Sequence, residues 1–134
     1  MTRRVAAPCL VLLAACGGGV GPSRGVDLGQ PFQLAVGETV AVDEGALSLT
    51  FVGVVSDSRC PIDAVCIVAG DALLQLRVRQ QARSTQLIEL TSPSRPRGRA
   101  DGYEIEALSL LPAPRASVPI PPNAYVAGLV VRRP

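Results

Sequence analysis

Cys60 and Cys66, in the middle of the chain, come closest to a pair of residues that could do chemistry. Five residues separate them, within the stretch SRCPIDAVCIVAG that runs from Ser58 to Gly70. A redox centre of the thioredoxin type needs Cys-x-x-Cys at the start of a helix, which lowers the pKa of the first thiol. A zinc site needs four ligands, and the chain has no histidine and only four cysteines. The spacing therefore favours a structural disulfide that closes a short loop, with redox activity as the alternative.

The composition removes most catalytic chemistries. Without histidine there is no Ser-His-Asp or Cys-His arrangement, and without lysine there is no Schiff base. No glycine-rich phosphate loop is present, and the absence of tryptophan argues against a surface that stacks bases. We therefore expect no enzyme, no cofactor and no metal. The alternative is an enzyme or a weak Ca²⁺ site built on the carboxylates of Asp57, Asp63 and Asp71.

The N-terminus carries an export pattern. Arg3 and Arg4 provide a positive start, and Val5 to Leu13 form an apolar stretch too short to cross a bilayer. The next residues, Leu13-Ala14-Ala15-Cys16, resemble a bacterial lipobox. The resemblance implies cleavage before Cys16, a lipid on the Cys16 thiol and an acylated new N-terminus. Such a chain would be held at a membrane through its acyl groups, palmitate among them.

Three segments follow from this interpretation. Residues 1–15 are the expected signal peptide, residues 16–26 the lipidated cysteine with a flexible glycine-rich tether, and residues 27–134 the folded domain. Gly17, rather than aspartate, follows Cys16, which resembles lipoproteins sent on to the outer membrane. The expected location is the cell envelope, on the periplasmic face of the outer membrane if the host is Gram-negative.

Loss of the signal peptide changes both the charge and the cysteine count. It removes Arg3 and Arg4 and leaves eleven arginines against eleven acidic residues, so the mature chain is formally neutral and a nucleic-acid partner is not expected. It also removes Cys9, and the lipid occupies Cys16. Cys60 and Cys66 then have only each other, in a compartment where disulfides persist.

The pattern of the domain is that of β-strands. Apolar and polar residues alternate with period two, twelve prolines and thirteen glycines interrupt the chain, and no segment has helical spacing. A change of phase near Ala107 predicts a β-bulge. We expect an all-β domain, a small antiparallel β-sandwich or barrel-like fold of six to eight short strands, with alternating segments at 32–36, 39–42, 47–55, 74–79, 86–91, 103–110 and 125–132.

A second resemblance lies around the two cysteines. Residues 57–61 read DSRCP and residues 66–72 read CIVAGDA. This is similar to a motif, D-S-R-C-P followed by C-x-W-A-G-x-A, of small bacterial exported and lipid-anchored proteins of unassigned function. The resemblance implies a fold family and an envelope location rather than an activity. Val68 stands where the motif has tryptophan, so a site that depends on that ring is not expected here.

The function expected from these observations is that of a non-enzymatic binding or structural module, tethered to the membrane and contacting an envelope protein or a glycan. The candidate binding loop contains Arg59, Pro61, Ile62 and Asp63. The alternative is a protease inhibitor that presents the loop 59–66, with Arg59 filling a trypsin-like specificity pocket. A further alternative is that the arginines of the loop 92–99 contact anionic lipid or glycan.

Overall fold

The computed structural model describes residues 24–81 and 83–134. The expected signal peptide, the lipidation site Cys16 and the first part of the tether lie outside the described residues, so these predictions stay predictions. The described residues form nine strands and one short 3₁₀ turn: β1 (Arg24–Val26), β2 (Phe32–Ala35), β3 (Thr39–Val42), β4 (Leu47–Asp57), β5 (Ala72–Gln80), β6 (Gln86–Ser92), β7 (Arg97–Ala100), β8 (Tyr103–Leu111), η1 (Pro122–Ala124) and β9 (Val126–Arg132).

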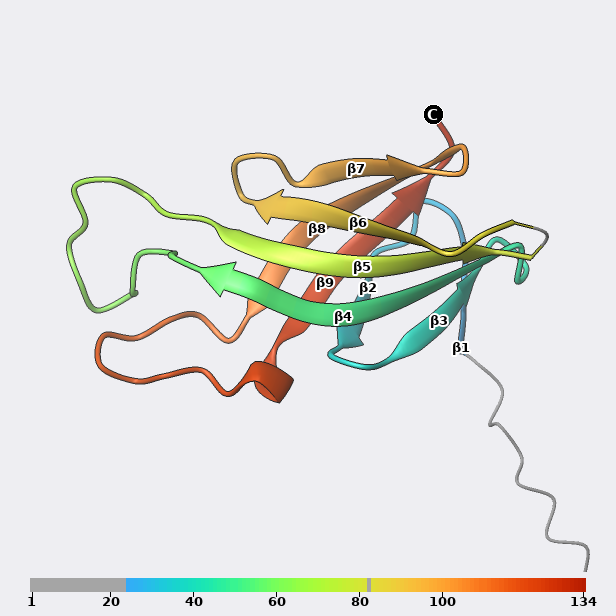
Figure 1. Cartoon of the computed structure of the whole chain (residues 1–134). Helices are drawn as coiled ribbons and strands as arrows, with labels where there is room; N and C mark the ends of the chain where they lie inside the picture. Colours follow the sequence, from blue (N-terminus) through green and yellow to red (C-terminus); the bar gives the residue numbers. More distant parts are fainter. Residues whose placement is uncertain (1–23, 82) are drawn as a thin grey trace, which may run out of the picture.

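The strands make two sheets that pack face to face (Figure 1). One sheet has the order β1-β3-β4-β5-β6 and the other has the order β2-β9-β8-β7. All neighbouring strands are antiparallel except β1 and β3, which are parallel. The predicted all-β class is confirmed, and the arrangement is a small β-sandwich. Among the described residues, no helix combines the length and the apolar character that crossing a membrane requires.

The strand count is nine rather than six to eight, because two short edge strands were not predicted. Arg24–Val26 pair with β3 in the register Arg24 to Val40, so these residues belong to the sandwich and not to the tether. Arg97–Ala100 pair with β8, within a segment that was expected to be a loop. Both strands are short, glycine-containing and arginine-containing. They lack the apolar alternation that is typical of a buried strand, so they are identified as strands only by their backbone pairing with β3 and β8.

The core consists of the inward-facing residues of both sheets. Side chains on β4, β5 and β8 largely alternate between buried and accessible positions as the sequence predicts, whereas the five residues of β9 from Ala127 to Val131 are all buried. Most of the buried side chains are aliphatic. Phe51 is the largest fully buried side chain. The neighbouring strands β5 and β6 form an antiparallel pair, and the predicted bulge lies between Ala107 and Ser109, where the register with β9 shifts. The phase change therefore lets Ala107 and Leu110 both face the core.

Two long loops leave the same end of the sandwich (Figure 1). The first connects β4 to β5 and contains both cysteines. The second connects β8 to β9 and contains five prolines between residues 112 and 122. Because β4 pairs with β5 and β8 with β9, each loop begins and ends at adjacent strand positions. The sandwich therefore brings together two segments about fifty residues apart in the chain, and this end is the candidate functional site.

Candidate functional site

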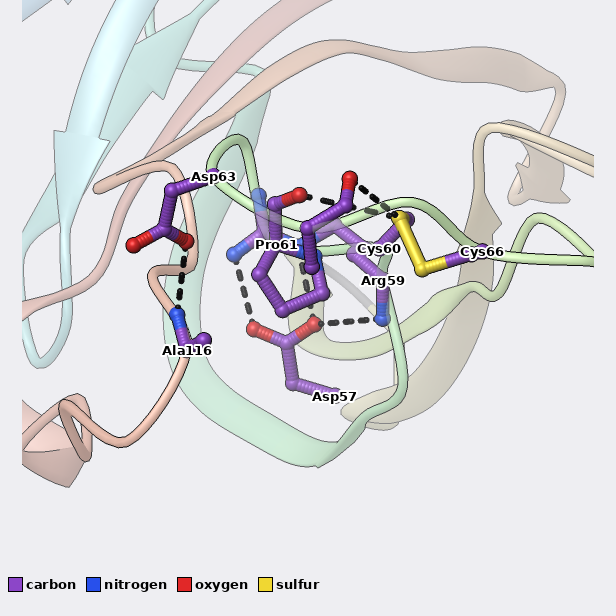
Figure 2. The surroundings of a disulfide bond; sticks show 8 residues. Asp57, Arg59, Cys60, Pro61, Asp63, Cys66 and Ala116 are labelled. Atoms are coloured by element: carbon purple, nitrogen blue, oxygen red, sulfur yellow. Dashed lines mark hydrogen bonds and ion pairs between the residues drawn. A yellow bond between two sulfur atoms is a disulfide. The ribbon is translucent and has the colours of Figure 1, made fainter.

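The loop between β4 and β5 is closed by the predicted disulfide. Cys60 and Cys66 are bonded, with their Cα atoms 6.0 Å apart. At the base of the loop, the Ser58 backbone N–H donates to Asp71 O at 2.8 Å, and the Ser58 Oγ contacts both the Asp71 carbonyl and its backbone N–H. Figure 2 shows the bridge and its surroundings. The predicted disulfide is thus confirmed, and it lies in a loop between two strands rather than at the start of a helix, where a thioredoxin-type redox centre would lie.

Gly70 lets the two sides of the loop approach each other. A Cβ atom on residue 70 would lie 1.6 Å from the backbone oxygen of Ser58, a distance that no packing adjustment of a side chain relieves. Only glycine fits while the Ser58–Asp71 backbone bond is made. The glycine within the motif therefore has a structural explanation: it permits the narrow neck from which the bridged loop projects.

Arg59 and Asp57 form a two-bonded ion pair beside the bridge (Figure 2). Arg59 Nε donates to Asp57 Oδ1 at 2.8 Å and Nη2 donates to Oδ2 at 2.7 Å. Both side chains are largely buried, 15 % and 11 % exposed. Tyr125 OH also donates to Asp57 Oδ2, at 3.1 Å. Planar, fork-shaped pairing of this kind fixes a guanidinium in one orientation, so Arg59 serves as an anchor inside the domain.

The same guanidinium joins the two loops. Arg59 Nη1 donates to the carbonyl of Leu110 at 2.8 Å, and Nη2 donates to the carbonyl of Pro112 at 3.0 Å. These carbonyls lie where β8 runs into the proline-rich loop, whose prolines have no N–H to donate. Arg59 therefore connects the end of β4 to the other sheet.

Hydrogen bonding sets the protonation of this cluster. The Arg59 guanidinium, as hydrogen-bond donor to Asp57, holds the pKa of that carboxyl below its usual value, against an opposing effect of burial. Burial, followed by the hydrogen bond to Asp57, raises the pKa of Tyr125. Both effects keep the carboxylate charged and the phenol neutral at physiological pH. The cluster is thus a fixed structural centre rather than an acid–base pair near neutrality.

A second contact joins the loops closer to their ends. The backbone N–H of Ala116 donates to Asp63 Oδ1 at 2.8 Å, which Figure 2 also shows, and the backbone N–H of Ile62 donates to the carbonyl of Pro114 at 2.9 Å. Together with the Arg59 contacts, these bonds make the bridged loop and the proline-rich loop one structural unit. We call residues 58–71 and 112–121 together the tip.

The tip exposes aliphatic side chains. Val65 and Ile67 have exposures of 102 % and 104 %, Val68 of 79 %, and Ile62 and Val118 of 59 % and 58 %. We call these five side chains the apolar tip residues. In addition, the proline-rich loop has a shallow hollow of about 240 Å³ lined by Pro112, Ala113, Arg115, Val118, Pro119, Ile120 and Pro121. Several aliphatic side chains exposed at one loop end are typical of a contact site rather than of a solvated loop.

Sequence reasoning identified only part of this surface. Of the predicted binding-loop residues, Ile62 is exposed at the tip and Pro61 is half-buried, while Asp63 bonds the other loop and Arg59 points into the domain. Val65, Ile67, Val68 and Val118 were not identified from the sequence as part of an exposed apolar surface. One signal was present: Ile67 and Val68 are adjacent, and two consecutive side chains of an extended segment cannot both face one core.

The two alternative sites gain no support from the geometry. Because Arg59 is engaged by Asp57 and two carbonyls, it is not presented to a protease pocket. Asp57, Asp63 and Asp71 are each engaged separately; Asp71 accepts hydrogen bonds from the backbone N–H and the Oγ of Ser94. In the part of the chain that the structure covers, no group of three or more acidic, cysteine or histidine residues is placed to hold a metal ion.

The arginines of the segment 92–99 divide into two groups. Arg97 and Arg99 lie on β7 and face Glu106 and Glu104 of β8, at 3.3 Å and 3.7 Å. Arg95 is exposed in the turn before β7, and no ion pair involves it within the described residues. The three side chains therefore do not form one basic patch.

A further charged cluster lies at the opposite end of the sandwich, where β3 turns into β4. Tyr103 OH donates to Asp43 Oδ2 at 2.7 Å, and Arg133 pairs with the same carboxylate and lies over the Tyr103 ring, 5.3 Å from its centroid. The Tyr103 hydrogen bond is the main cause that lowers the pKa of Asp43. Each member has its partner within the cluster, so we assign it a structural role in holding the last residues against the sheet.

Comparisons with known proteins add no relative: a scan against protein-family models, a search of curated proteins and a search of solved structures each gave no match.

Removing the bridge should destabilise the domain moderately. For the pair Cys60→Ala/Cys66→Ala we expect the free energy of unfolding to fall by about 2 kcal/mol, the loop-closure entropy for so short a ring. Urea unfolding of the two chains measures this. Reductant should lower the stability of the wild type to that of the double variant and leave the variant unchanged. Equal stability of all samples would mean that the Arg59 and Asp63 contacts hold the loop without the bridge.

Proposed function

We propose that this chain is a lipid-anchored protein of the bacterial envelope whose β-sandwich is a non-enzymatic binding module. Cys16 carries the anchor, residues 17–23 connect it to the domain, and the tip makes the contact. In a Gram-negative host the proposed place is the periplasmic face of the outer membrane. A disulfide between Cys60 and Cys66 agrees with folding outside the cytoplasm.

The apolar tip is the observation that supports a binding role. Five aliphatic side chains are exposed on two loops that are held by a disulfide, by the Arg59 ion pair and by hydrogen bonds between the loops. Burying aliphatic side chains is favourable, so a soluble domain gains nothing by exposing them unless another surface covers them. The rigid base means that little conformational entropy is lost when the tip is covered.

Metabolic labelling tests the anchor. Cells that express the full chain are grown with radioactive palmitate, and the immunoprecipitated protein is examined for label. Wild type is expected to carry label and Cys16→Ala to carry none, because the thioether forms only on that thiol. Cys9→Ala is the matched control and should be labelled like wild type, since Cys9 lies in the expected signal peptide. Equal labelling of wild type and Cys16→Ala would contradict the proposal.

A further inference from the structure

We infer that the tip binds a lipid bilayer, with its apolar residues inserted at the depth of the headgroups and the first acyl carbons. This inference rests on the proposed function, since it names the partner of the same site. The expected insertion is shallow because the loop backbone has polar groups that the hydrocarbon core would leave without partners.

The side chains at the tip suit lipid better than protein. The apolar tip residues are all valine or isoleucine, and within 58–71 and 112–121 there is no aromatic residue and no methionine. Protein interfaces concentrate their binding energy in tryptophan, tyrosine and arginine anchors seated in pockets of the partner. The tip has no aromatic anchor, and the side chains of the five apolar tip residues transfer to hydrocarbon without leaving hydrogen-bonding groups unsatisfied.

The charges around the tip are also arranged for a lipid surface. The two acidic residues of the tip and Asp57 just before it all bond groups of the protein: Asp57 bonds Arg59, Asp63 accepts from the Ala116 N–H and Asp71 accepts from Ser94. In contrast, Arg115 in the proline-rich loop and Arg95 near the base of the tip are exposed, and neither has an ion pair within the described residues. Arginines beside an inserted apolar segment reach the phosphates of the headgroups.

Arg95 is placed beside the tip by its neighbour. The backbone N–H and the Oγ of Ser94 both bond the Asp71 carboxylate, at 3.0 Å and 2.9 Å. The turn that contains Arg95 therefore lies at the neck of the bridged loop. The apolar tip residues are thus flanked by one arginine from each of two different connections.

The length of chain before the domain allows the tip and the anchor to meet one bilayer. In the sheet, Arg24 pairs with Val40, and Val40 pairs with Leu49 of β4. The eight residues of β4 that follow Leu49, up to Asp57 at the base of the tip, extend about 26 Å. Seven residues separate Cys16 from Arg24, and the eight Cα–Cα steps between them span at most about 29 Å when the chain is fully extended. Because the two lengths are similar, a lipid on Cys16 and an inserted tip are compatible when the strands are inclined to the membrane.

The absence of tryptophan in the chain provides a local probe of insertion. Ile67→Trp places a single reporter at a fully exposed tip position, and Leu87→Trp places one at an exposed position on β6, away from the tip. Each full-length chain, with Cys16 intact or as Cys16→Ala, is studied with phosphatidylcholine–phosphatidylglycerol vesicles that contain lipids brominated at shallow acyl positions. Tryptophan within about 5–10 Å of the headgroup boundary is quenched by these lipids.

We expect the emission of Ile67→Trp to shift to the blue and to fall about twofold with brominated lipids, and that of Leu87→Trp to stay unchanged. Adding Val65→Asp and Val68→Asp to the Ile67→Trp chain should abolish the quenching, because a carboxylate resists burial. These two side chains are 102 % and 79 % exposed, so their replacement leaves the core intact.

Two results would overturn the inference. Ile67→Trp emission that stays at the wavelength and intensity of Leu87→Trp would show a tip in water. A blue shift without quenching by bromine would show a tip covered by protein, for example by a second copy of the chain. The anchor is judged separately by palmitate labelling: a labelled chain with an unquenched tip refutes only the bilayer contact, and an unlabelled chain with a quenched tip refutes only the anchor.

Discussion

Replacing Asp57 by alanine is expected to lower the free energy of unfolding by about 3 kcal/mol and to loosen the tip. The change leaves the Arg59 guanidinium largely buried without its carboxylate, and a broken buried pair is destabilising by several kcal/mol. It also removes the acceptor of the Tyr125 hydroxyl. Since Arg59 holds the carbonyls of Leu110 and Pro112, the proline-rich loop should lose its attachment as well. Urea unfolding measures the stability, and amide exchange of Ile62, whose N–H bonds Pro114, reports the tip.

The matched control for this change is Asp63→Ala. Asp63 is an exposed carboxylate of the same tip that accepts one backbone hydrogen bond, so its removal should lower the stability by about 1 kcal/mol or less. If both variants lose the same stability, the ion pair is not the centre that joins the loops.

The pH dependence of stability gives an independent measure of the Asp57 pair. The pKa of Asp57 in the native state lies below its usual value of 3.8, so the unfolded chain binds a proton at a higher pH than the native one. The stabilisation is therefore fully present above about pH 5 and is lost as the pH falls through 3.8 toward the native pKa. The Asp57→Ala chain lacks this contribution, so its stability should fall less than that of the wild type over the same range. Parallel acid unfolding curves would contradict the assignment.

Replacing Phe51 by alanine should have the largest effect of all, a loss of about 3–5 kcal/mol in the free energy of unfolding. Phe51 lies on β4, in the centre of its sheet, and is the largest of the fully buried side chains. The surrounding core is mostly aliphatic, and Tyr103 and Tyr125 are fixed by hydrogen bonds, so no nearby ring can fill the cavity. Against a total of about 5–15 kcal/mol, the variant would be close to unfolding at ordinary temperature.

Phe32→Ala is the control for the loss of a phenyl ring as such. Phe32 is half-buried on β2 and packs against the edge of the core, so about 1–2 kcal/mol is expected. Phe51→Leu should recover more than half of the loss, because an aliphatic side chain fills most of the space. Urea midpoints of the four chains, with unchanged slopes, check these expectations. A similar loss for both alanine variants would show that burial of Phe51 does not dominate the core.

The amino-acid sequence by itself determined the features that depend on local pattern. Period-two alternation predicted the long strands β4, β5, β8 and β9, and a change of phase predicted the bulge after Ala107. The count and spacing of cysteines predicted the Cys60–Cys66 bridge. In each case the information lies within a few residues, because a strand's two faces and a short loop closure are set by neighbours in the chain.

Other features were decided only by the tertiary structure. Arg59 reads in the sequence as an exposed charge beside a loop, but its partners include the carbonyl of Leu110, 51 residues away, and that contact turns it inward. The edge strands β1 and β7 form because neighbouring strands offer backbone groups. The exposure of Val65, Ile67 and Val68 depends on a bridged loop that projects beyond the sheets, where no core is within reach. Hydrophobicity is a property of the residue, whereas burial depends on which distant segments the fold brings over it.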